Sequence, residues 1–348
     1  MLKVTALLLA VNMFIAALSG CDNKPDSSDN TDISQGVTDV ADEKITLSNP
    51  NATPEAQRVY EYLNEMYKQK IISGQQESTW MGTPDYEMEH IQNVSGKLPA
   101  IRGLDYMHMD FDGVNKRAIE WWEKGGIVTI CWHCGSDFTG EWTDCMQDEI
   151  SDWAKALTEG TPEYETLIKG MDMGAEALLK LQEAGVPVLW RPFHELNGHW
   201  FWWSKGGAEN FKKLWTIMYD RYTNHWGLNN LIWVFGYSHS SGVINKMEDW
   251  YVGDEYCDIV GADSYDKGSN AKLYEGVVKF IGDRKPICFH ECGTIPTVNE
   301  LKNDKALWGY FMTWHTSYIT DENSASHINE IYNSDYVITL DELPNFKE

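Results

Sequence analysis

Residues 186–203 read VPVLWRPFHELNGHWFWW, and the interpretation of the whole chain starts from this stretch. It begins as a short apolar run, which is typical of a buried strand. It then turns polar at Arg191, His194 and Glu195 and closes in an aromatic cluster. Charged side chains are costly inside a dry core. We therefore expect this strand to deliver them to the mouth of a pocket.

Short apolar stretches of the same kind recur and alternate with amphipathic segments. Strands are predicted at residues 70–76, 98–106, 126–133, 186–195, 230–238, 258–265, 286–293 and 308–315. Helices are predicted from Pro54 to about Lys70 and at residues 113–124, 164–184, 208–225 and 271–283. Continuous apolar strands that alternate with helices indicate a parallel sheet covered by helices. Eight such units predict an α/β fold, a (β/α)8 TIM barrel that forms a single domain.

Nearly every predicted strand ends in polar or aromatic side chains. In chain order these are Gln76, Asp105 and Tyr106, His133, His194 and Glu195, Ser238, Asp263 and Tyr265, His290 and Glu291, and Trp314 and His315. In a (β/α)8 barrel the carboxyl ends of all strands meet at one face, where active sites lie. A doubly wound open sheet is the alternative fold, but no glycine-rich phosphate-binding loop follows any of the strands. We expect these side chains to gather around one pocket.

The first 50 residues have the composition of an export signal and a linker. Residues 1–20 combine an early lysine with a short apolar run, which predicts a secretory signal peptide. The segment Leu18-Ser19-Gly20-Cys21 resembles a bacterial lipobox, in which the cysteine is lipidated; an ordinary signal peptide with a chance cysteine is the alternative. Residues 21–50 are polar and acidic and predict a disordered tether before a folded domain at residues 51–348. These features predict an exported protein, lipid-anchored to a bacterial membrane at the cell surface or its periplasmic face.

The chain is strongly acidic and rich in aromatic residues. Its formal net charge of −25 would repel phosphate backbones, so nucleic acid is not expected as a partner. It holds 16 tryptophans and 17 tyrosines. Aromatic faces serve as platforms for sugar rings as well as core packing, so we expect a division between the two roles.

Six cysteines follow Cys21. Cys134 and Cys145 are candidates for a disulfide across one loop, although pairing cannot be read from a sequence. Cys131-Trp132-His133-Cys134 has the spacing of metal ligands. No second such pair occurs in the sequence, so we expect no metal.

Two glutamates close the fourth and seventh predicted strands, and each follows a histidine. They are Glu195 and Glu291, and the ends of these strands face each other across the mouth of a barrel. Glycoside hydrolysis requires two carboxyl groups that flank the scissile bond, one protonated and one ionised. A lone glutamate would be interpreted as a salt-bridged barrel residue, but the pair indicates catalysis.

The motif RPFHELNGHWFWW, from Arg191 to Trp203, resembles the signature of glycoside hydrolase family 26, a β-mannanase family of the retaining (β/α)8 clan. DIVGADSY at residues 258–265 and the Glu-x-Gly of HECG at residues 290–293 extend the resemblance, which covers the chain from about residue 53. Two features depart from the family pattern. Leu196 stands where methionine is frequent, and the loop after His133 reads Cys-Gly-Ser-Asp-Phe.

This resemblance implies a catalytic domain and roles for eight side chains. Glu195 matches the acid/base and Glu291 matches the nucleophile. The implied substrate-binding residues are His133, Arg191, His194, Trp200, Tyr265 and Trp314, and the tyrosine matches one that hydrogen-bonds the nucleophile. The implied reaction is double-displacement hydrolysis of β-1,4-mannosidic bonds in mannan, galactomannan or glucomannan, with no metal or organic cofactor.

The expected partner is thus a β-mannan polysaccharide or manno-oligosaccharide, bound by a monomer whose only membrane contact is its lipid anchor. One alternative is a β-glucanase or β-1,3-xylanase of the same architecture. Another is a non-catalytic surface lipoprotein that binds glycans. Such a binding protein would keep aromatic platforms but would need no opposed glutamate pair.

Overall fold

The computed structural model describes residues 45–239, 247–282 and 284–348. The predicted signal peptide, Cys21 and most of the predicted tether lie outside these residues. Within the described ranges no helix combines the length and apolarity needed to span a membrane. The packed chain begins before the predicted boundary at residue 51, because the Leu47 side chain is buried and the backbone N–H of Ser48 donates to the Asp258 carboxylate at 2.6 Å.

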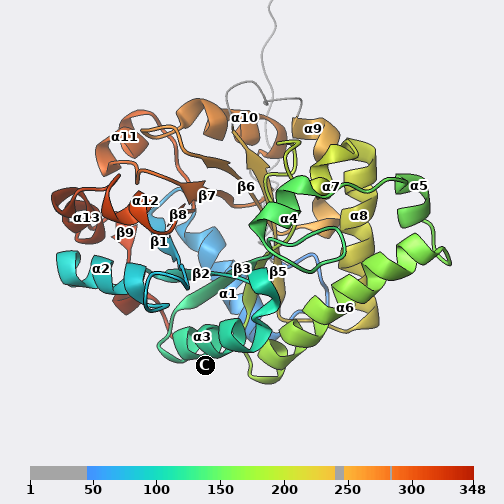
Figure 1. The fold of residues 1–348 in the computed structure, drawn as a ribbon. Helices are drawn as coiled ribbons and strands as arrows, with labels where there is room; N and C mark the ends of the chain where they lie inside the picture. Colours follow the sequence, from blue (N-terminus) through green and yellow to red (C-terminus); the bar gives the residue numbers. More distant parts are fainter. Residues whose placement is uncertain (1–44, 240–246, 283) are drawn as a thin grey trace, which may run out of the picture. The chain divides into compact units, whose positions relative to one another are not determined.

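Eight parallel strands close into a barrel at the centre of the molecule (Figure 1). They are β1 (Ile71–Gln76), β2 (Ile101–Asp105), β3 (Ile127–Cys131), β4 (Val188–Arg191), β5 (Leu231–Ser238), β6 (Ile259–Ser264), β7 (Ile287–Cys292) and β8 (Tyr310–Thr313). Each strand pairs in parallel with the next, and β1 pairs with both β2 and β8. The ring is therefore complete, which confirms the (β/α)8 TIM barrel and excludes the open doubly wound sheet. A short strand, β9 (Val337–Ile338), adds to the start of β1.

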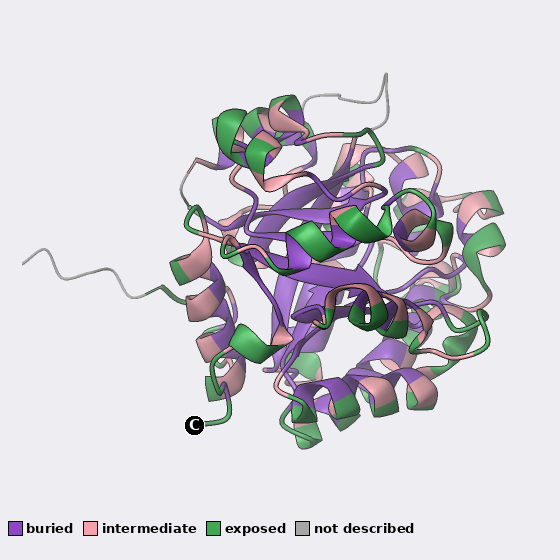
Figure 2. Cartoon of the chain, turned by 90° about the vertical axis from the view of Figure 1, so that its left-hand side faces the viewer, coloured by how far each residue is buried: buried purple, intermediate pink, exposed green. Residues whose placement is uncertain are grey.

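Helices surround the barrel. The longer ones are α1 (Pro54–Met66), α2 (Tyr86–Ser95), α3 (Phe111–Glu123), α6 (Pro162–Glu183), α8 (Ala208–Asp220), α10 (Ala271–Ile281) and α13 (Ala325–Tyr332). The shorter helices and turns are η1 (Met107–Met109), α4 (Trp142–Gln147), α5 (Trp153–Ala156), α7 (Trp202–Lys205), η2 (Arg221–His225), α9 (Met247–Trp250), η3 (Asp254–Tyr256), α11 (Val298–Asn303), α12 (Ser317–Thr320) and η4 (Leu340–Glu342). Figure 2 shows the strands almost entirely buried, while the exposed residues lie mainly on the helices and loops around them.

Local chemistry explains where the helices begin and end. The Thr161 side chain accepts a hydrogen bond from the backbone N–H of Tyr164, and Pro162 occupies the first turn of α6, so this helix starts two residues before the prediction. Helix α1 ends at Met66 rather than near Lys70, because Lys68 adopts a positive φ of 67° that no α-helix can include.

The cysteines contribute to packing and not to cross-links. All six in the described residues are free and buried, so the proposed pair of Cys134 and Cys145 is not formed. The Cys134 thiol instead donates a weak hydrogen bond to the carbonyl oxygen of Trp132 at 3.8 Å. These thiols behave as small apolar side chains that fill the core.

The barrel interior tolerates no added atom at Gly261 on β6. A Cβ there would lie 1.9 Å from the carbonyl oxygen of Cys288 and 2.6 Å from Nε2 of His290. We predict that Gly261→Ala lowers the free energy of unfolding by about 3 kcal/mol, as overpacking does in dense cores. Chemical denaturation with circular dichroism measures the change.

Gly276→Ala is the matched control. Gly276 lies within α10 and a Cβ there meets no atom within 4 Å. Alanine at this helical position should raise stability by about 0.5–1 kcal/mol. Equal effects of the two substitutions would contradict the tight packing of β6 against β7.

Candidate active site

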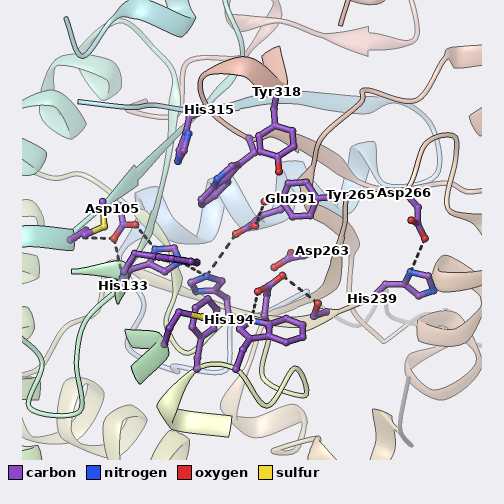
Figure 3. Close-up of a pocket in the computed structure, with 18 of the residues that line it drawn as sticks. Asp105, His133, His194, His239, Asp263, Tyr265, Asp266, Glu291, His315 and Tyr318 are labelled. Atoms are coloured by element: carbon purple, nitrogen blue, oxygen red, sulfur yellow. Dashed lines mark hydrogen bonds and ion pairs between the residues drawn. The ribbon is translucent and has the colours of Figure 1, made fainter. Parts of the chain in front are cut away.

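A cleft of about 740 Å³ opens at the carboxyl ends of the barrel strands (Figure 3). Its volume falls within the range of small-ligand sites. The cleft is lined by Trp80, Asp105, Met107, His133, Trp142, Met146, His194, Glu195, Trp200, Phe201, Ser238, His239, Asp263, Tyr265, Asp266, Glu291, Trp314, His315 and Tyr318. Seven of the eight site residues predicted within the barrel line it, and the eighth, Arg191, lies against it and donates to Glu291.

The loop after β4 turns sharply to bring Glu195 into the cleft. The strand ends at Arg191, four residues earlier than predicted, because Phe193 and Glu195 both adopt positive φ values of 48° and 51°. Residues in this left-handed region cannot continue a strand, and such strain is concentrated at functional sites. Asn197 ties the loop to β5, since its side-chain oxygen accepts from the backbone N–H of Ser238 at 2.8 Å.

The tryptophans after Glu195 divide between structure and cleft. Trp202 and Trp203 are fully buried, and their indole N–H groups donate to the carbonyl oxygens of Cys134 and His194 at 2.9 Å. Trp200 instead lines the cleft, and its indole N–H donates to the Glu195 carboxylate at 2.7 Å.

A glycine makes this fold-back possible. A Cβ on Gly198 would lie 2.4 Å from the ring of Trp200, so only glycine lets that ring pack over the turn. The hydroxyl of Ser238 gives Glu195 a second donor at 3.3 Å. Burial raises the pKa of Glu195 to about 7, and the nearby charge of Glu291 adds to the rise, while the hydrogen bond from Trp200 opposes it.

Glu291, on β7, has charged and polar donors on both of its oxygens. The Arg191 guanidinium donates to one oxygen, and the Tyr265 hydroxyl donates to the other at 2.8 Å. Arg191 also donates to Asp263 at 3.1 Å, so one guanidinium joins two carboxyl groups from different strands. Burial, reinforced by the charge of Glu291, raises the pKa of Asp263 well above its usual range. This shift favours the protonated form of Asp263, while Glu291 keeps two donors, Arg191 and Tyr265.

Two histidines and an aspartate form a hydrogen-bonded chain at the ends of β2, β3 and β4. Nδ1 of His133 lies 2.5 Å from the Asp105 carboxylate, and its Nε2 lies 3.0 Å from Nε2 of His194. Burial lowers the pKa of His133, but the Asp105 carboxylate more than offsets this and raises it overall. Burial and the charge of Arg191 lower the pKa of His194 well below its usual range. These opposite shifts favour a proton on Nε2 of His133 that is donated to Nε2 of His194.

The three carboxyl groups on the cleft floor are close together. One oxygen each from Glu195, Asp263 and Glu291 lie within 4.8 Å of one another. Their environments differ: burial and a like charge favour the protonated form of Glu195, while Glu291 lies against a guanidinium. Two neighbouring carboxyl groups whose environments differ in this way can serve as an acid and a nucleophile.

Among the residues that the structure describes, two clusters have the spacing of metal ligands, and the side chains of neither are poised for a cation. In the first, Asp105 and His133 hydrogen-bond each other, and burial raises the pKa of the neighbouring Cys131 thiol well above its usual range. Metals bind the thiolate, which burial disfavours here. In the second, which is formed by Glu195, Asp263 and Glu291, the last two carboxyl groups already pair with Arg191, whose positive charge opposes a metal cation.

Comparison with known proteins agrees with this geometry. Residues 48–342 match the family model of glycosyl hydrolase family 26. The chain belongs to glycosyl hydrolase family 26. The resemblance carried by the motif after β4 is therefore confirmed.

Several relatives within family 26 have names that describe their activity. The chain is 33% identical to the mannan endo-1,4-β-mannosidase of Thermothelomyces thermophilus, over 87% of this chain and 64% of that protein. It is 35% identical to mannan endo-1,4-β-mannosidase B of Piromyces sp, over 86% of this chain and 54% of that protein. The chain thus spans about half to two thirds of the length of these curated relatives.

The fold comparison gives the same family. The crystal structure of the Podospora anserina GH26-CBM35 β-(1,4)-mannanase matches with a TM-score of 0.78 and 36% identity, over 87% of this chain and 70% of that chain.

For some residues in and around the cleft, the sequence motifs predicted no specific role. Asp105 and Asp263 were predicted only as side chains at strand ends, and their contacts with His133 and Arg191 are ones that no local pattern reveals. Asn197 lies inside the motif after β4, but its hydrogen bond to Ser238 was not predicted. His290 ends a strand as expected, yet it lies buried outside the cleft and hydrogen-bonds the hydroxyl of Tyr310 at 2.7 Å.

Proposed function

We propose that this family 26 protein is a retaining glycoside hydrolase that cleaves β-1,4-mannosidic bonds. The observation that carries the proposal is the close approach of Glu195 and Glu291, whose oxygens lie within 4.8 Å. Retaining enzymes place their two carboxyl groups roughly 5–5.5 Å apart, whereas inverting enzymes need roughly 6.5–9.5 Å to admit a water. The short separation supports direct attack by one carboxylate on the sugar.

In the first step Glu291 attacks the anomeric carbon while Glu195 transfers its proton to the glycosidic oxygen. The bond from carbon to the leaving oxygen breaks as the bond from carbon to the Glu291 oxygen forms, which yields a glycosyl-enzyme ester. The donors Arg191 and Tyr265 hold the attacking carboxylate in place. A pKa of about 7 lets Glu195 arrive protonated at neutral pH.

In the second step Glu195, now ionised, takes a proton from water. The resulting hydroxide attacks the anomeric carbon, the ester bond breaks, and Glu291 is released as a carboxylate. The net outcome is hydrolysis with retention, because two inversions occur at one carbon. The ring of Trp314 lines the cleft beside His133, with the two ring centroids 6.2 Å apart, and supplies an apolar face for the sugar.

A mannan substrate is proposed from the names of the relatives. The two proteins compared above are mannan endo-1,4-β-mannosidases, and the solved relative is a β-(1,4)-mannanase. A β-mannan polysaccharide or a manno-oligosaccharide is the corresponding partner of this chain. Hydrolysis of β-glucan or β-1,3-xylan, with none of mannan, would replace this substrate assignment.

One prediction from this mechanism concerns the nucleophile, Glu291. Glu291→Gln should lower kcat on mannan by about a thousandfold or more, because an amide cannot form the ester. Glutamine keeps a partner for the buried Arg191, which an alanine would leave uncompensated. Asp172→Asn is the control, since Asp172 also pairs with an arginine, Arg221, but does so on the outer helices.

Stereochemistry gives the same test a second readout. Proton NMR of the wild-type reaction should show the β-anomer as the first product. Initial release of the α-anomer, or near wild-type turnover by Glu291→Gln, would overturn the retaining mechanism.

Another prediction concerns the pH dependence of kcat/KM. The proton donor must be protonated, so kcat/KM should fall about tenfold per pH unit above the pKa of Glu195, which lies near 7. The indole of Trp200 favours the ionised form, so Trp200→Phe should move this alkaline limb to higher pH. Trp226→Phe, at an indole that donates to Asp172 on the outer helices, should leave the limb in place. A limb that moves to lower pH in Trp200→Phe contradicts the assignment.

We also propose that the protein is exported and lipid-anchored through Cys21. The support is the sequence Leu18-Ser19-Gly20-Cys21 and the polar residues that follow it. Cells fed a labelled fatty acid should label the wild-type protein but not Cys21→Ser, and the variant should leave the membrane fraction. Equal labelling of the two proteins would contradict the anchor.

A further inference from the structure

The tyrosine that donates to Glu291 is only partly enclosed by the protein. Its hydroxyl lies 2.8 Å from the Glu291 carboxylate, yet 39% of the surface of Tyr265 is exposed. An exposed side chain keeps its rotamer freedom unless neighbouring groups remove it. A hydroxyl that swings away from Glu291 would no longer hold the attacking carboxylate. The groups that restrain the Tyr265 ring therefore matter for the reaction.

A second tyrosine packs directly on this ring. Tyr318, on α12 after β8, has its ring centroid 4.9 Å from that of Tyr265, and the two planes are tilted by 47°. Within the described part of the chain, it is the only aromatic ring that packs on Tyr265. Figure 3 shows the two rings beside each other, next to Glu291. Aromatic pairs at this spacing stabilise each other beyond the area that they bury.

The approach of the two rings depends on a glycine after β7. Gly293 directly follows this strand and closes the sequence HECG. A Cβ there would lie 3.0 Å from the ring of Tyr318 and 3.3 Å from that of Tyr265, which is tighter than ordinary van der Waals contact. Glycine therefore lets both tyrosine rings pack against the backbone that carries Glu291.

One buried side-chain amide fixes the backbone of Tyr318. Asn323 is 1% exposed, and its Nδ2 donates to the carbonyl oxygens of Tyr318 at 2.7 Å and of Gly293 at 2.9 Å. Its Oδ1 accepts from the backbone N–H of Ile295 at 2.9 Å. Leaving such buried groups without partners is costly, so the amide holds the segment after β7 and α12 together.

We propose that Tyr318 and Asn323 are positioning residues that keep the Tyr265 hydroxyl on the Glu291 carboxylate. Asn323 fixes the backbone of Tyr318, and the Tyr318 ring limits the movement of the Tyr265 ring. Neither residue needs to touch the sugar in this role. The inference deepens the proposed function and rests on it, because Glu291 is taken as the attacking carboxylate.

The test is a double-mutant cycle on mannan hydrolysis. Tyr318→Leu should lower kcat about tenfold with little change in KM, because the hydrogen bond to Glu291 weakens in the transition state. Tyr265→Phe, which removes the hydroxyl, should lower kcat at least as much. In the double variant the further loss caused by Tyr318→Leu should be less than about twofold, since no hydroxyl is left to position.

A sugar contact is the alternative role for Tyr318, because this residue also lines the cleft. Removal of a sugar contact in Tyr318→Leu would raise KM, and the loss would be equally large when Tyr265→Phe is already present. Either result overturns the positioning role. Full kcat in Tyr318→Leu would overturn it as well.

Two further variants test the ring and the amide separately. Tyr318→Phe keeps the ring and removes only the hydroxyl, so it should retain the wild-type kcat, and a tenfold loss would contradict the proposal. Asn323→Ala should reproduce the fall in kcat, and it should add little to Tyr265→Phe. Tyr62→Ala is the matched control, because Tyr62, on α1, packs edge-to-face on Phe346 at 5.4 Å and does not line the cleft. Its kcat should equal that of the wild type.

Crystal structures of the variants separate this proposal from the proposed function. In Tyr318→Leu the Tyr265 hydroxyl should lie beyond hydrogen-bonding distance of Glu291, and in Tyr318→Phe it should remain bonded. If this shift occurs but the wild type hydrolyses no mannan, the proposed function fails while the restraint on Tyr265 stands. If the wild type hydrolyses mannan and Tyr265 stays bonded to Glu291 in Tyr318→Leu, only the positioning role fails.

Discussion

The buried guanidinium of Arg191 is the constraint on which the rest of the cleft depends. A positive charge removed from water requires compensation, and here two carboxyl groups from neighbouring strands supply it. Burial and the negative charge of Glu291 favour the protonated form of Asp263. The same negative charge reaches Glu195 and, with burial, raises its pKa. Burial and the charge of Glu291 thus raise the pKa values of Asp263 and Glu195, and the guanidinium of Arg191 opposes both rises.

The loop after β4 places Glu195 in the cleft beside these charged groups. Its positive-φ residues are unfavourable in isolation, so the surrounding packing must impose them. The buried indole of Trp202 donates to Cys134 in the loop after β3, and that of Trp203 donates to His194 within the loop itself. Asn197 links the loop to β5. The aromatic run after Glu195 is thus mainly a scaffold, and Trp200 is the tryptophan of that run that lines the cleft and donates to Glu195.

Most of the fold could be predicted, since each strand of the barrel is buried on both faces and therefore reads as an apolar run. Errors arose where a local pattern conflicts with distant contacts. The predicted fourth strand ran to Glu195, but the chain leaves the sheet at Arg191 because the turn must aim the glutamate into the cleft. Leu47 was assigned to a tether, yet it packs into the core and its neighbour Ser48 pairs with Asp258, 210 residues away.

The sequence by itself determined the family, the eight-unit barrel and the pair of glutamates at the ends of strands four and seven, because periodicity and a long motif are local properties. Only the tertiary structure decided the separation of that pair and the different partners of its members. Arg191 meets Glu291 across 100 residues, and Asp105 meets His133 across 28. A carboxyl group's pKa depends on its burial and on nearby charges, and folding brings these from distant parts of the chain. The motif could therefore assign the acid/base role to Glu195 only by resemblance, and the physical cause of its raised pKa lies in the folded chain.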